Sequence, residues 1–132
     1  MSTLRTNALE GVDAKNSITI VAGAGNVTTT NVQQGLCKVW ISFDGTGTVS
    51  ASSIKDSFNA TSLTDNTTGN YDINFTNDMG NINFAHVSGC RSEISRSLGV
   101  SSTSKCTVQT EDDNFNVEDV SDIYDAIFGD LA

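Results

Sequence analysis

The chain has few of the side chains that carry nucleophilic or metal chemistry: one histidine, His86, three cysteines and one tryptophan in 132 residues. A single imidazole excludes any catalytic or metal site that needs two histidines. His86 lies inside the alternating run 82–90, which predicts a strand. In that position an imidazole is better explained by packing or surface exposure than by catalysis. We therefore expect a structural or surface role for His86.

The three cysteines, Cys37, Cys90 and Cys106, form an odd number and include no Cys-x-x-Cys pair. This pattern argues against a disulfide framework and against a zinc site, so we interpret them as reduced, small apolar packing residues. Cys90 follows His86 by four residues and shares its strand face, but along a strand the two lie about 13 Å apart. That separation excludes a Cys90–His86 dyad.

Carboxylate chemistry has little support as well. The acidic cluster at 111–114 lacks the D-x-D-x-D-G spacing and the distal Glu of a calcium loop, and it is typical of a solvated turn. Paired carboxylates that cleave glycosides need a cleft with aromatic platforms, whereas this chain has one Trp and two Tyr. The sequence therefore predicts no catalytic residue, no cofactor site and no metal site, and we expect no enzyme activity.

Positive charge is also scarce: 7 Lys and Arg stand against 16 Asp and Glu, which gives a net charge of −9. Attraction to phosphate groups is unfavourable at this charge, so nucleic acid is not an expected partner. No apolar run approaches the length of a membrane span, and no basic segment precedes an apolar signal region. We expect neither membrane insertion nor secretion.

Apolar residues make up 37% of the chain, below the usual share of about 45–50%. A monomer of this size buries only about two thirds of the surface that its unfolded chain exposes. Because the polar sequence nevertheless has the alternation of strands, we expect copies of the chain to share their apolar faces. A homo-oligomer is the simplest form of that sharing.

What the chain does contain is strand after strand. The run from Leu36 to Phe43 alternates β-branched and aromatic residues with polar ones, and the glycines of Asp44–Gly47 suit a tight reversal. Further strands are predicted at 17–22, 27–32, 48–51, 57–64, 71–75, 82–90 and 105–110. Strands that are joined by turns and have one wet face predict an all-β, antiparallel sandwich, jelly-roll-like.

Two stretches depart from this pattern. The polar span 91–104 predicts a long exposed loop, where variable contact residues concentrate. In the C-terminal part, apolar residues recur at three- and four-residue steps, which favours a short helix with Gly129 as its stop. Its β-branched content also allows a strand, so both structures stay open for 117–128. The apolar residues of this stripe are Val117, Val120, Ile123, Tyr124, Ile127 and Phe128.

The middle third of the chain contains a series of short phrases in a fixed order. They are Lys38–Val49 with its Trp and its Gly-Thr-Gly-Thr-Val turn, Ser57–Asn59, Thr64–Asn66, Gly69–Tyr71, and Asn74–Phe75 followed by Thr76 and Met79. In these phrases the chain resembles a repeated β-module of tailed-bacteriophage fibre and appendage proteins, of the type found in phages of aquatic bacteria. One difference is the segment 50–56, which is longer here than the short basic link of the family.

The resemblance implies a structural component of a phage virion, a tail-fibre or appendage protein that contributes to assembly and to host attachment. Its expected location is the virion, assembled in the host cytoplasm, and its expected partners are two further copies of itself and other tail or capsid proteins. A capsid-decoration or head-fibre protein is one alternative. A glycan-binding module on the virion surface, with 91–104 as its contact loop, is another.

The expected organisation has three parts: a virion-attachment segment at 1–16, a β-sandwich at 17–110 and an acidic C-terminal segment at 111–132. In the expected homotrimer, three subunits around an axis share apolar faces and leave fewer free strand edges. The predicted packed core consists of Trp40, Ile41, Phe43, Phe58, Tyr71, Ile73 and Phe75.

Overall fold

The computed structural model describes residues 19–22, 28–98 and 102–132. The chain divides into two compact units, 1–36 and 37–132. The sandwich expected at 17–110 therefore has other limits, because the strands before residue 37 lie in the first unit and the last strand of the chain lies in the second. The attachment segment expected at 1–16 lies outside the described residues.

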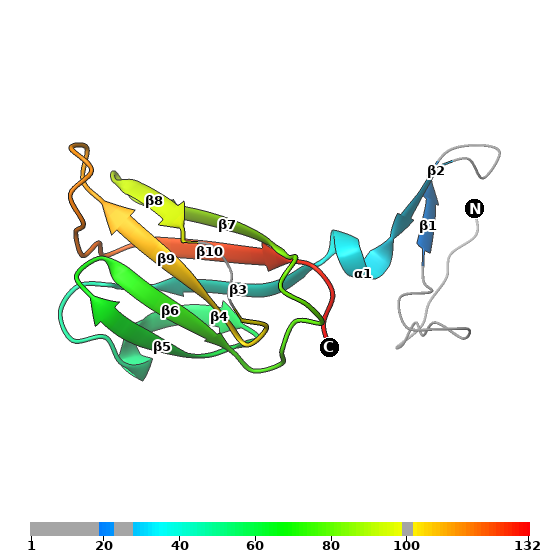
Figure 1. Cartoon of the computed structure of the whole chain (residues 1–132), viewed down its shortest axis with the longest axis horizontal. Coiled ribbons are helices and arrows are strands. Elements are labelled where there is room, and N and C mark those ends of the chain that lie inside the picture. Colours follow the sequence, from blue (N-terminus) through cyan, green and yellow to red (C-terminus); the bar gives the residue numbers. More distant parts are fainter. Residues whose placement is uncertain (1–18, 23–27, 99–101) are drawn as a thin grey trace. The chain divides into compact units, whose positions relative to one another are not determined.

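The described part of the first unit is a small antiparallel hairpin. Strand β1 (Thr19–Ala22) pairs with β2 (Thr28–Asn31), and the single helical turn α1 (Val32–Gly35) follows (Figure 1). Both strands are rich in β-branched residues, which favour extended backbone. The strands predicted at 17–22 and 27–32 thus pair with each other over the described residues.

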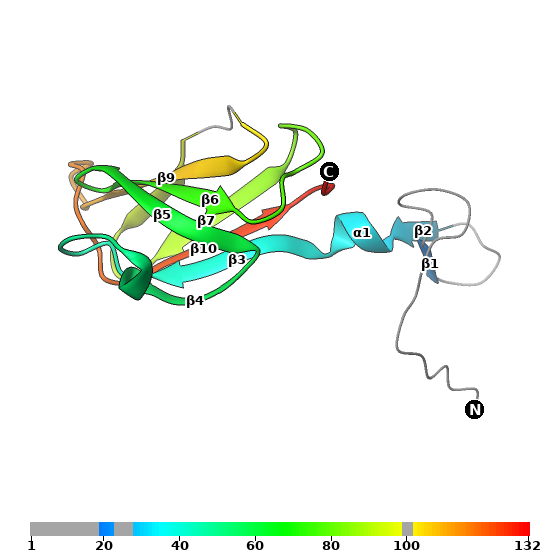
Figure 2. The same cartoon turned by 90° about the horizontal axis from the view of Figure 1, so that it is seen from below.

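The second unit consists of two four-stranded antiparallel sheets, seen as two layers in Figures 1 and 2. We call them the Trp sheet and the Tyr sheet after Trp40 and Tyr71. The Trp sheet has the order β4 (Ile54–Phe58), β3 (Cys37–Phe43), β10 (Ile123–Phe128), β7 (Ala85–Cys90). The Tyr sheet has the order β5 (Ala60–Thr67), β6 (Asn70–Phe75), β9 (Lys105–Glu111), β8 (Ile94–Ser97). The all-β, antiparallel, sandwich-like prediction is confirmed.

The core lies between the two sheets and follows the alternation of the strands. On β3 it takes Val39, Ile41 and Phe43, and the Phe43 ring meets the edge of Tyr71 at a centroid distance of 5.4 Å. Five of the seven predicted core residues are buried here: Ile41, Phe43, Tyr71, Ile73 and Phe75.

The other two predicted core residues are not in the core, because Trp40 is 38% exposed and Phe58 is 53% exposed. The residues Val39, Trp40 and Ile41 are all apolar, so this part of β3 carries no signal for which of its faces is inward. Val39 and Ile41 pack between the sheets, and the alternation then places Trp40 on the outer face of the Trp sheet. Phe58 is paired with Trp40 in register and shares that face.

The hairpin after β3 is longer than predicted. The expected strand at 48–51 is absent, since 46–48 form a bend and Ala51–Ser53 form a 3-10 turn, and the partner of β3 is β4 instead. At the start of this connection Gly45 lies against Tyr71. A Cβ atom added at Gly45 would come within 2.6 Å of Tyr71 Oη and 2.9 Å of Ile123 Cδ1.

Residues 123–128 form a strand, which corrects the helix favoured for 117–128. Strand β10 inserts between β3 and β7, and Ile123, Asp125 and Ile127 point into the sandwich while Tyr124 points out. Two ladders of backbone hydrogen bonds outweigh the local helical period, because a strand inserted between two others pairs its backbone groups on both sides. The apolar residues that have helix-like spacing are thus divided between the inward and outward faces of the strand.

The span 91–104 is only partly a loop. It contains β8, which pairs with β9 at the edge of the Tyr sheet, while 99–101 lie outside the described residues. Among the residues that the structure describes, no helix is long and apolar enough to cross a membrane.

Replacement of Gly45 by alanine should destabilise the sandwich, because the new methyl group overlaps the Tyr71 ring. We expect a loss of about 1–3 kcal/mol of unfolding free energy, the usual cost of overpacking a core. Gly89→Ala is the control, since a Cβ atom there meets nothing within 4 Å. Urea unfolding of both variants measures the difference, and equal stability of the two would contradict the packing described here.

Candidate functional site

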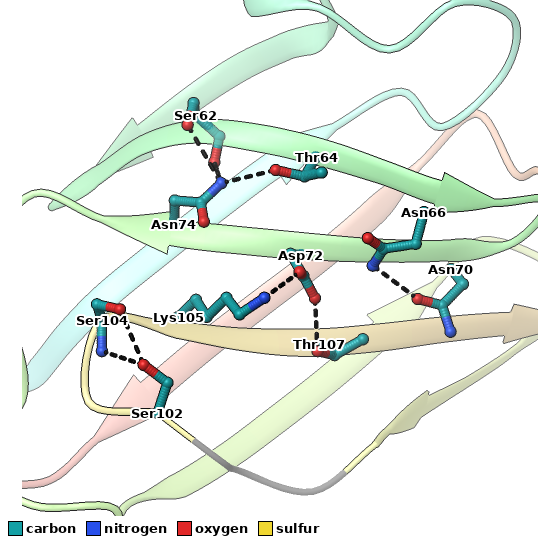
Figure 3. Close-up of polar contacts among 10 residues, drawn as sticks. All are labelled: Ser62, Thr64, Asn66, Asn70, Asp72, Asn74, Ser102, Ser104, Lys105 and Thr107. Carbon is teal, nitrogen blue, oxygen red and sulfur yellow. Dashed lines mark hydrogen bonds and ion pairs between the residues drawn. The ribbon is translucent and has the colours of Figure 1, made fainter.

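The outward face of the Tyr sheet is polar and bonded to itself (Figure 3). Asn74 Nδ2 donates to the Ser62 carbonyl and hydroxyl oxygens and to Thr64 Oγ1 across the β5–β6 pair. At the next outward position of β6, Asp72 accepts hydrogen bonds of 2.6 Å from Lys105 Nζ and from Thr107 Oγ1. The polar groups of this face therefore already have partners within the chain.

Asp72 shows the strength of that network. The residue is 6% exposed. Burial raises its pKa, but the hydrogen bonds from Lys105 and Thr107 outweigh burial and hold the pKa below its usual value. The carboxylate stays charged and paired at neutral pH. Its charge is thus held by the sheet and is not free to bind a partner.

The outward face of the Trp sheet has the opposite character. An apolar row crosses all four strands, because Phe58 on β4 pairs with Trp40 on β3, Trp40 with Ala126 on β10, and Ala126 with Val87 on β7. Val87 is 59% exposed, more than either aromatic ring of the row. Tyr124, 48% exposed, lies beside the row on β10. We call Phe58, Trp40, Ala126 and Val87 the apolar row.

The centre of this face carries no charged residue. The charged residues of its four strands that lie outside the core are Lys38 on β3 and Lys55 and Asp56 on β4, and Lys55 Nζ pairs with Asp122 just before β10. Lys38 is 5% exposed, and burial lowers its pKa. Asp56 lies on β4, at the edge of the sheet. On a chain of net charge −9 the centre of this face is therefore an uncharged, partly apolar surface.

A second feature lies between the two sheets, where His86 is held by residues that are distant in sequence. His86 Nε2 lies 2.6 Å from Asp125 Oδ1 on β10, and Ser97 Oγ of β8 lies 2.6 Å from His86 Nδ1. The His86 and Asp125 side chains are 2% and 0% exposed. Asp125 lies between the inward-facing Ile123 and Ile127 of β10, so a carboxyl group is buried in the core.

These distances match a serine, histidine and carboxylate relay, but the imidazole is enclosed between two sheets. The arrangement links β7 and β10 of the Trp sheet to β8 of the Tyr sheet through one ring. Asp125 Oδ2 and Ser88 Oγ are buried without a hydrogen-bond partner among the described residues, which makes the network sensitive to change. What it does in this structure is to hold the Asp125 carboxyl group in the core.

Cys106, not Cys90, is the cysteine that meets the histidine. Its Sγ lies 3.8 Å from His86 Nε2. Burial, and then the nearby charges of Asp125 and Asp72, raise the pKa of Cys106 well above its usual value. The thiol therefore stays protonated and is a poor nucleophile at neutral pH. The described cysteines are free, as the sequence predicted.

Sequence reasoning could not assemble this cluster. Asp125 lay within the stretch whose period favoured a helix, and Ser97 lay within an expected loop. Serine and aspartate are frequent in this chain, and only the pairing of β10 with β7 and of β8 with β9 brings one of each to the single histidine. No local signal connects positions that are 11 and 39 residues from His86.

An open hollow of about 350 Å³ lies where the loop after β3 meets the turn between β7 and β8. Its lining is polar and carries both Arg91 and Glu93 from the predicted contact span. The lining residues are Thr46, Arg91, Ser92, Glu93, Glu118, Asp119, Val120 and Ser121. It contains no aromatic side chain on which a sugar ring could stack.

Metal ligands do not gather in the described part of the chain, where no group of three or more His, Cys, Asp or Glu could hold an ion. In the acidic cluster, Glu111 belongs to β9 and pairs with Arg96. Asp112 Oδ1 instead accepts from the backbone amides of Asn114 and Asn116 and closes a turn.

Comparison with protein-family models, with curated proteins and with solved structures finds no match to this chain.

The buried pair of His86 and Asp125 predicts a marked non-additivity. His86→Leu should cost about 3–5 kcal/mol of unfolding free energy, because it leaves the Asp125 carboxyl group buried without its partner. The double variant His86→Leu/Asp125→Leu should be more stable than His86→Leu alone, since it removes the buried charge as well. Denaturant unfolding of the single and double variants tests this.

Ser97→Ala serves as the comparison, with an expected cost of about 0.5–1.5 kcal/mol for one hydrogen bond. If the two leucine substitutions were simply additive, His86 and Asp125 would not be coupled.

Proposed function

We propose that this chain is a structural component of a tailed-bacteriophage virion, a tail-fibre or appendage protein that acts as a homotrimer. The observation that supports this most is where the residues of the fibre-module resemblance lie. Many of them form the turns and contacts that build the second unit, while Trp40 and Phe58 lie on its outer face. A compact framework with an exposed apolar face suits a repeated building block of a particle.

Three of these residues show the point. Asp44 Oδ1 accepts from the amide and hydroxyl of Thr46 and shapes the turn after β3. Asn59 has a positive φ of 57° between β4 and β5. Its Nδ2 donates to the carbonyl oxygens of Lys38 and Asn77, and its Oδ1 accepts from the backbone amide and the Nδ2 of Asn77. Asparagine tolerates this left-handed conformation better than most residues.

Tyr71 completes the framework. Its hydroxyl lies 2.6 Å from Asp119 Oδ1 and 3.0 Å from the Gly45 carbonyl oxygen, and Asp119 also accepts from the Gly69 amide. The ring thereby ties the turn after β3 to the segment before β10. Gly45, Gly69 and Tyr71 all belong to the phrases that carry the resemblance.

Self-association is supported by the surface of the Trp sheet. The chain has only 37% apolar residues, yet several of them lie exposed in one row. Exposed apolar patches of this kind typically mark surfaces that a partner covers. The partners we propose are two further copies and other virion proteins, with the segment 1–16 as the virion-attachment segment. Host attachment is a further role of the assembled fibre.

The alternative within the same class is a capsid-decoration or head-fibre protein. The two differ in where the copies are placed and how many there are. Labelled antibody against the chain, imaged on intact particles, should mark the tail, and copies spread over the shell would instead support decoration.

A glycan-binding module is the second candidate, and the hollow lined by Arg91 and Glu93 is the observation in its favour. Charged and hydroxyl side chains there can bond sugar hydroxyl groups, but no aromatic ring of the lining offers a stacking surface. Binding on a glycan array that Arg91→Ala abolishes would support it, and absence of any retained glycan would remove it.

The full chain at micromolar concentration should assemble to three times the mass of one chain, because a sequence of low apolar content leaves part of its apolar surface to be covered by other copies. Size-exclusion chromatography with light scattering measures this. A stable monomer over the whole micromolar range would overturn the proposed assembly.

A further inference from the structure

We infer that the outward face of the Trp sheet, centred on the apolar row, is the surface through which copies of this chain bind one another. The inference rests on the proposed self-assembly and adds to it the contact face. The occupant is a second copy of the same chain, seated over Trp40 and its row neighbours.

The exposed apolar area is the first argument. Aromatic side chains offer about 150–250 Å² each, so the exposed fractions of Phe58, Trp40 and Tyr124, at 53%, 38% and 48%, amount to roughly 300 Å². One partner in an interface of standard size buries about 800 Å², of which about 450 Å² is non-polar. Three rings therefore supply most of that share, before Val87 is added.

The residue types are the second argument. Tryptophan, tyrosine and phenylalanine are enriched at the centres of interfaces, and charged residues are depleted there. The apolar row has this composition, with the two aromatic rings adjacent through the Trp40–Phe58 pair. The ladder positions beside the row include the small residues Ser42, Gly89 and Ala85, which let a partner approach closely. They alternate with the larger Tyr124, Phe128 and Asp56.

Charge selects the occupant. Two copies that each carry −9 repel one another over most of their surfaces. At the centre of this face they meet without that repulsion, because Lys38 is buried, and Lys55 and Asp56 lie on the edge strand β4, where Lys55 pairs with Asp122. A basic partner would gain no electrostatic attraction from an uncharged surface. A copy of the same chain meets less electrostatic repulsion here than over the rest of the surface.

The Tyr sheet does not offer an equal surface. Its outward polar groups, among them Asn74, Asp72 and Thr107, are already bonded to one another (Figure 3). Burial of this face would remove water from polar groups without the gain of new partners, which costs free energy. Of the two outward faces, only that of the Trp sheet gains from being covered.

Gly89 is a position at which the inference can be tested without harm to the fold. It lies outward on β7, beside Tyr124, and a Cβ atom there meets nothing within 4 Å. Gly89→Glu therefore places a negative charge on the face without a steric cost. Three such charges, or two across one contact, would oppose each other when copies meet.

The matched control is Thr67→Glu. Thr67 is exposed at the end of β5, the edge strand of the Tyr sheet, so the control adds the same charge to the other face. We expect Gly89→Glu to weaken self-association at least 100-fold and Thr67→Glu to leave it within threefold, with both variants as stable in urea as the parent chain. Light scattering across a dilution series measures the association.

Trp40 provides a direct readout of the face, since it is the one tryptophan in the chain. In the assembled parent its emission should lie at shorter wavelength and be quenched by acrylamide several-fold less than in Gly89→Glu. Dilution of the parent should move both signals toward those of the variant.

The outcomes separate the inference from the proposed function. A parent that assembles while Trp40 emission and quenching stay unchanged on dissociation would place the contact elsewhere, which overturns the inference and leaves the assembly intact. If the parent is monomeric and Trp40 is shielded at every dilution, another part of the same chain covers the row. The inferred contact face and the proposed self-assembly would then both be wrong. Loss of assembly in Thr67→Glu as well as in Gly89→Glu would show a general charge effect and also overturn the inference.

Discussion

The contact between Phe43 of β3 and Tyr71 of β6 is the constraint on which the rest of the sandwich depends. It joins the two sheets edge to face, and the Tyr71 hydroxyl then ties the turn at Gly45 to Asp119 ahead of β10. With Phe43 inward, the alternation of β3 has one solution, because neighbouring side chains of a strand point to opposite faces. Trp40 is outward for that reason.

The same alternation gives the two sheets unequal outer surfaces. On the Tyr sheet the outward residues of β6 are Asn70, Asp72 and Asn74, and neighbouring strands supply donors and acceptors for them. On the Trp sheet the outward residues include Trp40, Phe58 and Val87, which have no polar groups to satisfy except the indole nitrogen. The polar groups of the Tyr sheet's outer face have hydrogen-bond partners within the chain, whereas the exposed apolar residues of the Trp sheet suit a binding partner. This difference connects the fold to the proposed assembly.

Inside the sandwich, the His86–Asp125 pair is a polar bridge in a core that consists mostly of apolar residues. A buried pair of this kind is not a strong source of stability, but loss of one partner is costly. It therefore favours one register of β10 between β3 and β7, since a shift by one residue would turn Asp125 outward and Tyr124 inward. The pair thereby specifies the register of β10 more strongly than its inward-facing isoleucines alone would.

The sequence by itself determined the class of fold, the positions of β3, β6 and β9, the free cysteines and five of the seven predicted core residues, because period-two alternation and turn residues are local signals. Only the tertiary structure decided the outward place of Trp40 and Phe58, the strand at 123–128 and the meeting of His86 with Asp125 and Ser97. In the run Val39–Ile41 both faces are apolar, and between 117 and 128 helical and extended spacings coexist. Such ambiguities are resolved by which strands pair, and pairing joins residues that are far apart in the chain.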